Sequence, residues 1–257
     1  MINDITVALL THNNDASIER ALESTLKFSN VIVIDSGSND NTLNICEKYK
    51  VRVLFNKFNS FKDQRNFALT KINTEFVLFL DSDEKITDDL LKFLIGDFKN
   101  NLAHDDYNIF EIFRTEFYNG KEIVYGFGRS NYQSRLLRVK KVAYHGDVHE
   151  YPVDLEGKAS FKFDTNLRLD HYPYRNLDSI MNRLVPYAKL ASIKKISNGK
   201  KIGFWLILLN LNWQILRLAW LGRKDGYAGV IAAFAEGISR AITYIYVYDA
   251  NKRKLVD

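Results

Sequence analysis

Four short apolar runs, each followed by a polar turn, divide the first 85 residues of the chain. The runs are ITVALL (5–10), VIVID (31–35), VRVLF (51–55) and FVLFL (76–80). Helices are expected between them: one that begins at Ser17, one of about ten residues that contains Leu43, Ile45 and Cys46, and one over residues 61–72. Continuous apolar runs are typical of strands that are covered on both faces. Their alternation with helices predicts an α/β fold built on a parallel, doubly wound sheet with right-handed crossovers.

The second half of the chain has a different texture. Residues 107–165 alternate between apolar and polar with period two, which predicts mixed or antiparallel strands that extend the sheet. Residues 176–197 carry an apolar stripe at helical spacing, with Pro186 as an expected kink. Because no Gly/Ser/Pro-rich linker interrupts the chain, we expect one catalytic-type domain over residues 1–175 and a helical C-terminal extension over residues 176–257.

Composition adds a few bounds. The 257 residues are 46% hydrophobic and 26% charged, with a net charge of +5 and a pI near 9.0. This balance suits an anionic ligand or an anionic membrane surface, although a basic excess spread over a solvated surface is the commoner explanation. Cys46 is the only cysteine, which excludes an internal disulfide and a cysteine-based zinc cluster and fits a reducing compartment. The first residues lack a secretory signal, so we expect a cytoplasmic protein.

Acidic residues follow two of the predicted strands. Asp35 comes after the second strand, and Asp81 and Asp83 come after the fourth. Because the carboxyl ends of parallel strands meet at one edge, where such sheets bind ligands, these carboxylates should lie together. Two carboxylates two residues apart can hold Mg²⁺ or Mn²⁺, which take further ligands from substrate phosphates. Asp and Ser also cap turns at strand ends, so this alternative stays open.

Individual roles follow from the chemistry of each side chain. Asp35 can accept hydrogen bonds from a base N–H or from ribose hydroxyls, or it can cap the following turn, and Asp81 can do the same while Asp83 holds the metal. Lys62 and Arg65 would bring positive charge to a nucleotide, or they form a solvated helix face. The chain has neither a GxxxxGK[ST] nor a GxGxxG sequence, so a P-loop or dinucleotide-binding protein is not supported.

Several blocks in order resemble the family-2 glycosyltransferases of GT-A fold. They are VALLTHNN (7–14), VIVIDSGSNDNT (31–42), KDQRNFAL (62–69) and FVLFLDSDE (76–84). The blocks GDVHE (146–150) and DGYAG (225–229) resemble the small bacterial enzymes similar to lipopolysaccharide-core β-1,4-glucosyltransferases. The likeness covers nearly the whole chain, and it implies a GT-A fold, a mostly parallel central sheet flanked by helices, with a C-terminal helical tail.

The resemblance also implies roles for particular residues. The expected nucleotide-binding residues are Thr11, Asn13, Asp35, Lys62, Arg65, Asp81 and Ser82. Asp81 and Asp83 would form the metal-binding motif, with His171 as a third ligand unless it is a packed or capping histidine. Gly126 and Gly128 would lie in the loop near the donor sugar.

An inverting transfer needs a base that takes the proton of the acceptor hydroxyl, while a metal stabilises the departing diphosphate. The family pattern places an acidic residue for this task well downstream of the metal motif. Glu150 matches it best and Asp147 is the rival. An acidic residue on a loop rim is the alternative for Glu150.

The tail offers a surface of its own. In the apolar segment 202–221, the polar residues Asn210, Asn212, Gln214 and Arg217 make spanning a membrane costly. Trp205, Trp213 and Trp220 fall within a sector of about 80° on a helical wheel, and lysines precede the segment. This pattern favours an anionic membrane surface as partner, while packing on the catalytic domain or on another subunit of a homo-oligomer is the alternative. Residues 228–248 predict a further helix with Glu236 and Arg240 paired.

We therefore predict a metal-dependent inverting glycosyltransferase (a hexosyltransferase) that is peripheral on the inner face of the cytoplasmic membrane. Its donor would be a nucleoside diphosphate sugar, a UDP-sugar by default, and its acceptor a glycolipid or oligosaccharide hydroxyl of the cell envelope, such as lipopolysaccharide core. No nucleic acid partner is expected. The alternatives are a catalytically silent, membrane-associated scaffold that binds sugar nucleotides and a sugar nucleotidyltransferase, which should carry a Gly-rich loop where this chain has Thr11-His12-Asn13-Asn14.

Overall fold

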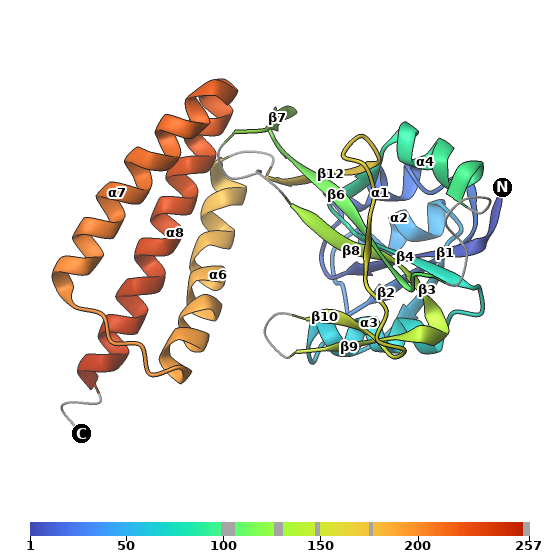
Figure 1. Cartoon of the computed structure of the whole chain (residues 1–257), viewed down its shortest axis with the longest axis horizontal. Helices are drawn as coiled ribbons and strands as arrows, with labels where there is room; N and C mark the ends of the chain where they lie inside the picture. The colour runs from blue at the N-terminus through green and yellow to red at the C-terminus, as the bar shows by residue number, and fades with distance from the viewer. Residues whose placement is uncertain (99–105, 126–130, 147–149, 175–176, 254–257) are drawn as a thin grey trace. The chain divides into compact units, whose positions relative to one another are not determined.

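The computed structural model describes residues 1–98, 106–125, 131–146, 150–174 and 177–253. The chain divides into two compact units (Figure 1). The first unit contains residues 1–114 and 130–171, and the second contains residues 115–129 and 172–257. Strand β6 (Ile109–Tyr118) and strand β12 (Arg168–Tyr174) each run from the first unit into the second.

Four parallel strands form one half of the sheet in the first unit. They are β1 (Ile2–Thr11), β2 (Phe28–Asp35), β3 (Arg52–Phe55) and β4 (Phe76–Asp81), in the spatial order β3-β2-β1-β4. The helices that connect them are α1 (Ile18–Glu23), α2 (Thr42–Lys48) and α3 (Phe61–Thr70). The predicted parallel, strand-then-helix arrangement is therefore confirmed.

The second half of the sheet is largely antiparallel, as the period-two pattern predicts. After β4 the strand order continues through β8 (Tyr132–Arg138), β6, β12 and β5 (Glu84–Ile86). Short strands β7 (Lys121–Ile123) and β11 (Phe161–Lys162) also pair with β6, while β9 (Val142–His145) and β10 (Tyr151–Asp154) form a separate two-stranded sheet. Helix α4 (Asp88–Ile95) follows β5.

The parallel strands β1, β2 and β4 are largely buried, which explains their continuous apolar sequence. The edge strand β3 is largely exposed, so the expectation that VRVLF is covered on both faces is wrong. In β4, Phe76, Leu78 and Leu80 contribute to one hydrophobic cluster. The intervening Val77 and Phe79 contribute to another. Because successive side chains of a strand point to opposite faces, the two clusters cover the two sides of the sheet.

The second unit contains three long helices that lie side by side in Figure 1: α6 (Leu177–Ser197), α7 (Phe204–Gly222) and α8 (Gly226–Arg253). Helix α6 runs through Pro186, and Glu236 pairs with Arg240 as expected. The segment Ala219–Arg253 is long and apolar enough to cross a membrane by length and composition. A single helix of this kind is weak support for a membrane span, because core helices of water-soluble proteins meet the same criterion.

Candidate functional site

The carboxyl edge of the parallel sheet brings the predicted strand-end residues together. In the strand register, Thr11 is paired with Asp35, and Leu10, next to Thr11, is paired with Asp81. Neighbouring strands lie about 4.8 Å apart, so these three strand ends are immediate neighbours. The prediction that they share one edge is confirmed.

The loops after β1 and β2 are joined to each other by polar contacts. The Asn13 N–H donates to Ser38 Oγ at 2.9 Å, and the Asn39 N–H donates to Asn13 Oδ1 at 2.8 Å. Asn13 has a φ of 54°, a left-handed conformation that asparagine tolerates better than most residues. The two loops therefore form one hydrogen-bonded rim beside Thr11 and Asp35.

Asp35 caps the turn that follows it. Its carboxylate accepts from the N–H groups of Gly37 at 2.8 Å and Ser38 at 3.0 Å, and the side chain is buried. Asp35 therefore caps the turn, which is one of the two roles expected for it. Its contact with a nucleotide stays a prediction. Burial, with a smaller effect of the Asp35 charge, raises the pKa of the neighbouring Cys46 thiol to about 11.

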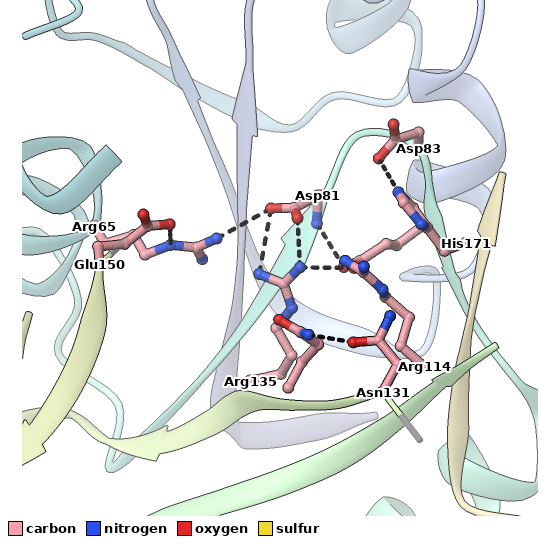
Figure 2. A network of polar contacts seen from close by, with 10 residues as sticks. Arg65, Asp81, Asp83, Arg114, Asn131, Arg135, Glu150 and His171 are labelled. Atoms are coloured by element: carbon pink, nitrogen blue, oxygen red, sulfur yellow. Dashed lines mark hydrogen bonds and ion pairs between the residues drawn. The ribbon is translucent and has the colours of Figure 1, made fainter. Parts of the chain in front are cut away.

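Asp81 is held by two arginines (Figure 2). Arg65 Nη2 lies 3.2 Å from Asp81 Oδ1, and both terminal nitrogens of Arg135 donate to the same carboxylate, Nη1 at 3.3 Å from Oδ1. Burial on its own would raise the pKa of Asp81, but the positive charges of Arg135 and Arg65 outweigh it and lower the pKa. Asp81 is therefore ionised at neutral pH.

Behind Asp81 lies a buried ionic network that the sequence reading missed. Glu84 is fully buried, and its Oε1 lies 2.6 Å from Arg135 Nη2 and 3.3 Å from Arg114 Nη1. Its Oε2 accepts the Asp81 N–H at 3.0 Å. The available signal was Arg135, a charged residue that directly precedes the apolar pair Leu136-Leu137 in the predicted strand. The network fixes both the side chain and the backbone of Asp81.

Arg65 occupies the centre of the site. Its guanidinium stands over the rings of Phe79 at 5.0 Å and Tyr144 at 5.4 Å, and its Nε lies 3.6 Å from Glu150 Oε1. The side chain is buried, so the solvated-face alternative is wrong for this residue, whereas Lys62 on the same helix is half-buried. Within the part of the chain that the structure describes, the buried Nη1 of Arg65 has no hydrogen-bond partner.

Asp83 and His171 face each other at the end of the antiparallel pair β5–β12. His171 is paired with Glu84 in the strand register, and its Nε2 lies 3.4 Å from Asp83 Oδ1 (Figure 2). A carboxylate and an imidazole are suitable donors for Mn²⁺ or Mg²⁺, so these two residues fit a divalent ion. No cluster of three or more His, Cys, Asp or Glu residues suited to a metal occurs among the described residues.

The remaining predicted residues fall into two groups. Ser82, between the two aspartates, is buried, and Glu150 is partly exposed beside Arg65. The rival base Asp147 and the glycines Gly126 and Gly128 lie outside the residues that the structure describes. The site as described thus consists of a rim, a central arginine and the Asp83–His171 pair.

The first unit is an α/β domain in which acidic residues stand at the carboxyl ends of parallel strands. The profile of glycosyl transferase family 2 matches residues 6–151, which is more than half of the chain. The protein belongs to glycosyl transferase family 2, and together with the observed sheet this confirms the predicted GT-A type of α/β fold. It is a glycosyltransferase.

Two relatives match over most of the chain. An uncharacterised glycosyltransferase of Rickettsia prowazekii is 24% identical over 247 residues, which cover 90% of this chain and 83% of its own. The lipopolysaccharide core biosynthesis glycosyltransferase LpsC of Rhizobium meliloti is 22% identical over 263 residues, which cover 97% of this chain and 94% of its own. The predicted likeness to enzymes of lipopolysaccharide-core assembly is therefore confirmed as a likeness.

Among solved structures, glucosyl-3-phosphoglycerate synthase from Mycobacterium tuberculosis, in complex with Mn²⁺, UDP and glucosyl-3-phosphoglycerate, matches in part. The identity is 23% and the TM-score 0.36, with 45% of this chain and 44% of that chain covered. The chain thus spans less than half of that protein. A TM-score this low supports no statement about the site.

Proposed function

We propose that this glycosyltransferase moves a sugar, with inversion, from a nucleoside diphosphate sugar to a hydroxyl of a cell-envelope glycan. A UDP-sugar is the default donor, and Mg²⁺ or Mn²⁺ is the proposed cofactor. The observation that carries the proposal is the convergence of Asp81, Asp83, His171 and Arg65 at one end of the sheet. Candidate metal ligands and cationic groups at this end of the sheet would together offset the negative charge of a diphosphate leaving group.

Arg65 supports the diphosphate part of the proposal. Its Nη1 is a buried cationic donor without a partner among the residues described, and such a group is costly unless a ligand satisfies it. Phosphate oxygens are strong acceptors for a guanidinium. In this proposal Arg65 contacts the diphosphate, and the joined rim of the loops after β1 and β2 holds the nucleoside beside Thr11 and Asp35.

The proposed metal ligands are Asp83 and His171, with Asp81 as the second carboxylate of the motif. When bound, the ion would stabilise the negative charge of the departing diphosphate. Asp81 is held by Arg135 and Arg65, so it keeps its charge and its orientation at the strand end. In this proposal the carboxylate of Asp81 accepts hydrogen bonds from the ribose hydroxyls, which is the role predicted from the sequence.

Glu150 is the proposed base. Its carboxylate is partly exposed, so an acceptor hydroxyl can reach it, and its Oε1 lies 3.6 Å from Nε of Arg65. A carboxylate in this position accepts the proton of the hydroxyl while the hydroxyl oxygen attacks the anomeric carbon. Asp147 remains the rival for this role.

One relative and the helical tail support a proposal for the acceptor and for the place of action. LpsC is named for lipopolysaccharide core biosynthesis, which supports an envelope glycan as acceptor for this chain. Acceptors of that class are amphiphiles that lie in a membrane. We therefore propose that the enzyme works at the inner face of the cytoplasmic membrane, as a peripheral protein.

A panel of sugar nucleotides tests the proposal. Purified full-length protein should hydrolyse one of them in the presence of Mn²⁺ or Mg²⁺, and chelation with EDTA should abolish the reaction. Asp83→Asn should abolish it too, whereas Asp164→Asn, a change at an exposed aspartate of the same unit, should leave it intact. Turnover that is indifferent to both the chelator and Asp83→Asn would contradict the proposal. Metal-dependent binding of the nucleotide without any turnover would favour the scaffold alternative instead.

A further inference from the structure

One face of helix α7 is apolar, aromatic and exposed. Five side chains on this face are between 64% and 74% exposed: Trp205, Leu209, Trp213, Leu216 and Trp220. At roughly 100° per residue all five fall within a sector of about 80°. We call these five residues the tryptophan face.

The opposite side of the same helix is packed. Ile207 is buried with Ile202 and with Val247 of α8. Ile207 is offset from the middle of the tryptophan face by about 160° on the helical wheel. Helix α7 therefore packs against the second unit through one side and presents its tryptophans on the other.

The charged residues of helix α7 and of the segment just before it are all positive. Residues 179–224 contain nine Lys and Arg residues and no Asp or Glu. Lys200 and Lys201 precede α7, and Arg223 and Lys224 follow it. The cations therefore stand at both ends of the tryptophan face, which is the charge pattern that attracts an anionic surface.

A hollow lies at the C-terminal end of α7. It has a volume of about 300 Å³ and is lined by Tyr125, Trp220, Leu221, Arg223 and Lys224. The Arg223 guanidinium is 3.5 Å from the centre of the Trp220 ring, and the Lys224 ammonium is 4.8 Å from that of Tyr125. Aromatic walls with two cations suit a phosphate-bearing headgroup at the boundary between apolar and aqueous surroundings.

The nearest acidic residue does not neutralise this hollow. The carboxylate of Asp225 accepts hydrogen bonds from the backbone N–H groups of Val124 at 3.2 Å and Tyr125 at 2.9 Å. Asp225 thereby fixes the strand end that carries Tyr125. The positive charges of Arg223 and Lys224 remain available to an anionic ligand.

We infer that the tryptophan face is a docking surface for an anionic phospholipid bilayer, with the hollow receiving a phosphate headgroup. Tryptophan prefers the headgroup boundary, and each cation near the surface favours anionic lipid. A second copy of the chain fits less well, because the face has cations at both ends, so pairing two such faces would oppose like charges in either orientation.

The inference deepens the proposed function, on which it rests for a membrane-borne acceptor. Lipid binding is measured without sugar transfer, so the docking surface and the proposed transferase function can each be contradicted independently of the other. The chain has only three tryptophans and all lie on this face, so their intrinsic fluorescence reports on it alone. Vesicles of phosphatidylcholine with 30% phosphatidylglycerol, on the order of cellular anionic content, should shift the emission to the blue. Brominated lipid should quench it, and neutral vesicles should give a much weaker response.

Three variants locate the surface by vesicle sedimentation. Replacing Trp205, Trp213 and Trp220 together by Ser should abolish sedimentation with anionic vesicles. Replacing Arg223 and Lys224 by Gln should lower the partition coefficient roughly 10- to 30-fold and weaken its salt sensitivity, given about 1 kcal/mol for each cation. The matched control is Leu26→Ser with Lys27→Gln, which changes an exposed leucine and lysine of the first unit and should have no effect.

Several outcomes would overturn the inference. Unchanged emission with anionic vesicles would contradict the proposed docking surface. Equal sedimentation of the triple variant and the parent protein would contradict it too. A blue-shifted emission without lipid, together with a dimer in analytical ultracentrifugation, would assign the face to a second copy. Resistance of the parent protein to extraction with alkaline carbonate would indicate a membrane span instead. The Arg223/Lys224 variant keeps all tryptophans, so the fluorescence test survives even if the triple variant misfolds.

Discussion

The Nε atom of Arg65 lies 3.6 Å from Oε1 of Glu150, while Nη2 of the same guanidinium lies 3.2 Å from Oδ1 of Asp81. One buried cation is thus shared between the proposed base and the first aspartate of the Asp-Ser-Asp motif. An incoming diphosphate would compete with both carboxylates for this cation.

The first prediction concerns Glu150. Glu150→Gln keeps the size and a hydrogen-bonding group but removes the base, so kcat should fall by roughly 10²- to 10⁴-fold with little change in donor affinity. Steady-state kinetics together with calorimetric titration of the donor separate the two quantities. Glu47→Gln, at an exposed site on α2, is the control and should retain full activity. Full activity of Glu150→Gln would leave Asp147 as the candidate.

The second prediction concerns His171. If this imidazole is a metal ligand, His171→Ala should raise the Mn²⁺ concentration needed for half-maximal activity by about 10- to 100-fold, comparable to the loss seen when support of a metal site is removed. A high concentration of Mn²⁺ should then restore turnover. A histidine with a purely structural role would instead lower the free energy of unfolding and leave the metal dependence unchanged, which thermal unfolding of the variant would reveal.

The third prediction concerns the buried network behind Asp81. Arg135→Met leaves the fully buried Glu84 with less compensation, and the loss of one partner of such a pair costs about 3–5 kcal/mol of unfolding free energy. Arg138→Met is the matched control on the same strand, because its partner Glu75 is half-exposed and can be solvated again. Urea unfolding should show a clearly smaller loss for the control. The double variant with Glu84→Gln should recover part of the stability.

The fourth prediction is a pH dependence. The pKa of Asp81 is lowered in the folded protein, so its contribution to stability is complete above its unfolded pKa of about 3.9 and is lost as the pH falls from there through the folded value. Arg135→Met removes much of the lowering. The stability that Asp81 contributes at neutral pH should therefore shrink, and the variant should lose less stability than the parent protein between about pH 5 and pH 2. Equal losses in both proteins would contradict this assignment.

The fifth prediction concerns the close approach of α7 and α8. A Cβ atom on Gly222 would overlap the backbone of Gly229, and a Cβ on Gly229 would overlap the backbone of Gly222. Because backbone atoms cannot move aside as a flexible side chain can, Gly222→Ala or Gly229→Ala should cost about 1–3 kcal/mol. Gly203→Ala is the control, since its Cβ would meet nothing within 4 Å. Thermal unfolding followed by circular dichroism would compare the three variants.

Much of the first unit could be predicted because it depends on local pattern. Strand β4 has both faces buried, and its residues are accordingly all apolar until Asp81. A parallel sheet places the ends of such strands at one edge, so the sequence could predict that Thr11, Asp35 and Asp81 share that edge. Likewise, a fixed helical period was enough to place the three tryptophans of α7 on one face.

The ionic contacts could not be predicted in the same way. Arg135, Arg114 and Glu84 come from strands far apart in the chain, and nothing in their local sequence states which carboxylate each arginine will meet. Arg65 shows the same limit, since its place on a helix is compatible with exposure, yet Phe79 and Tyr144 enclose it. Such contacts depend on strand pairing and on the packing between layers.

The sequence by itself determined the order of strands and helices along the chain, the class of fold and the type of chemistry. These depend on the spacing of apolar residues and on the residues at strand ends, both of which can be recognised within a few residues of sequence. Only the tertiary structure decided that Asp35 caps its own turn, that Asp81 is shared by two arginines and that His171 meets Asp83. The reason is physical: a charge in a protein interior takes its partner from whichever element the fold brings within a few ångströms, and that choice is made by the packing of the whole sheet.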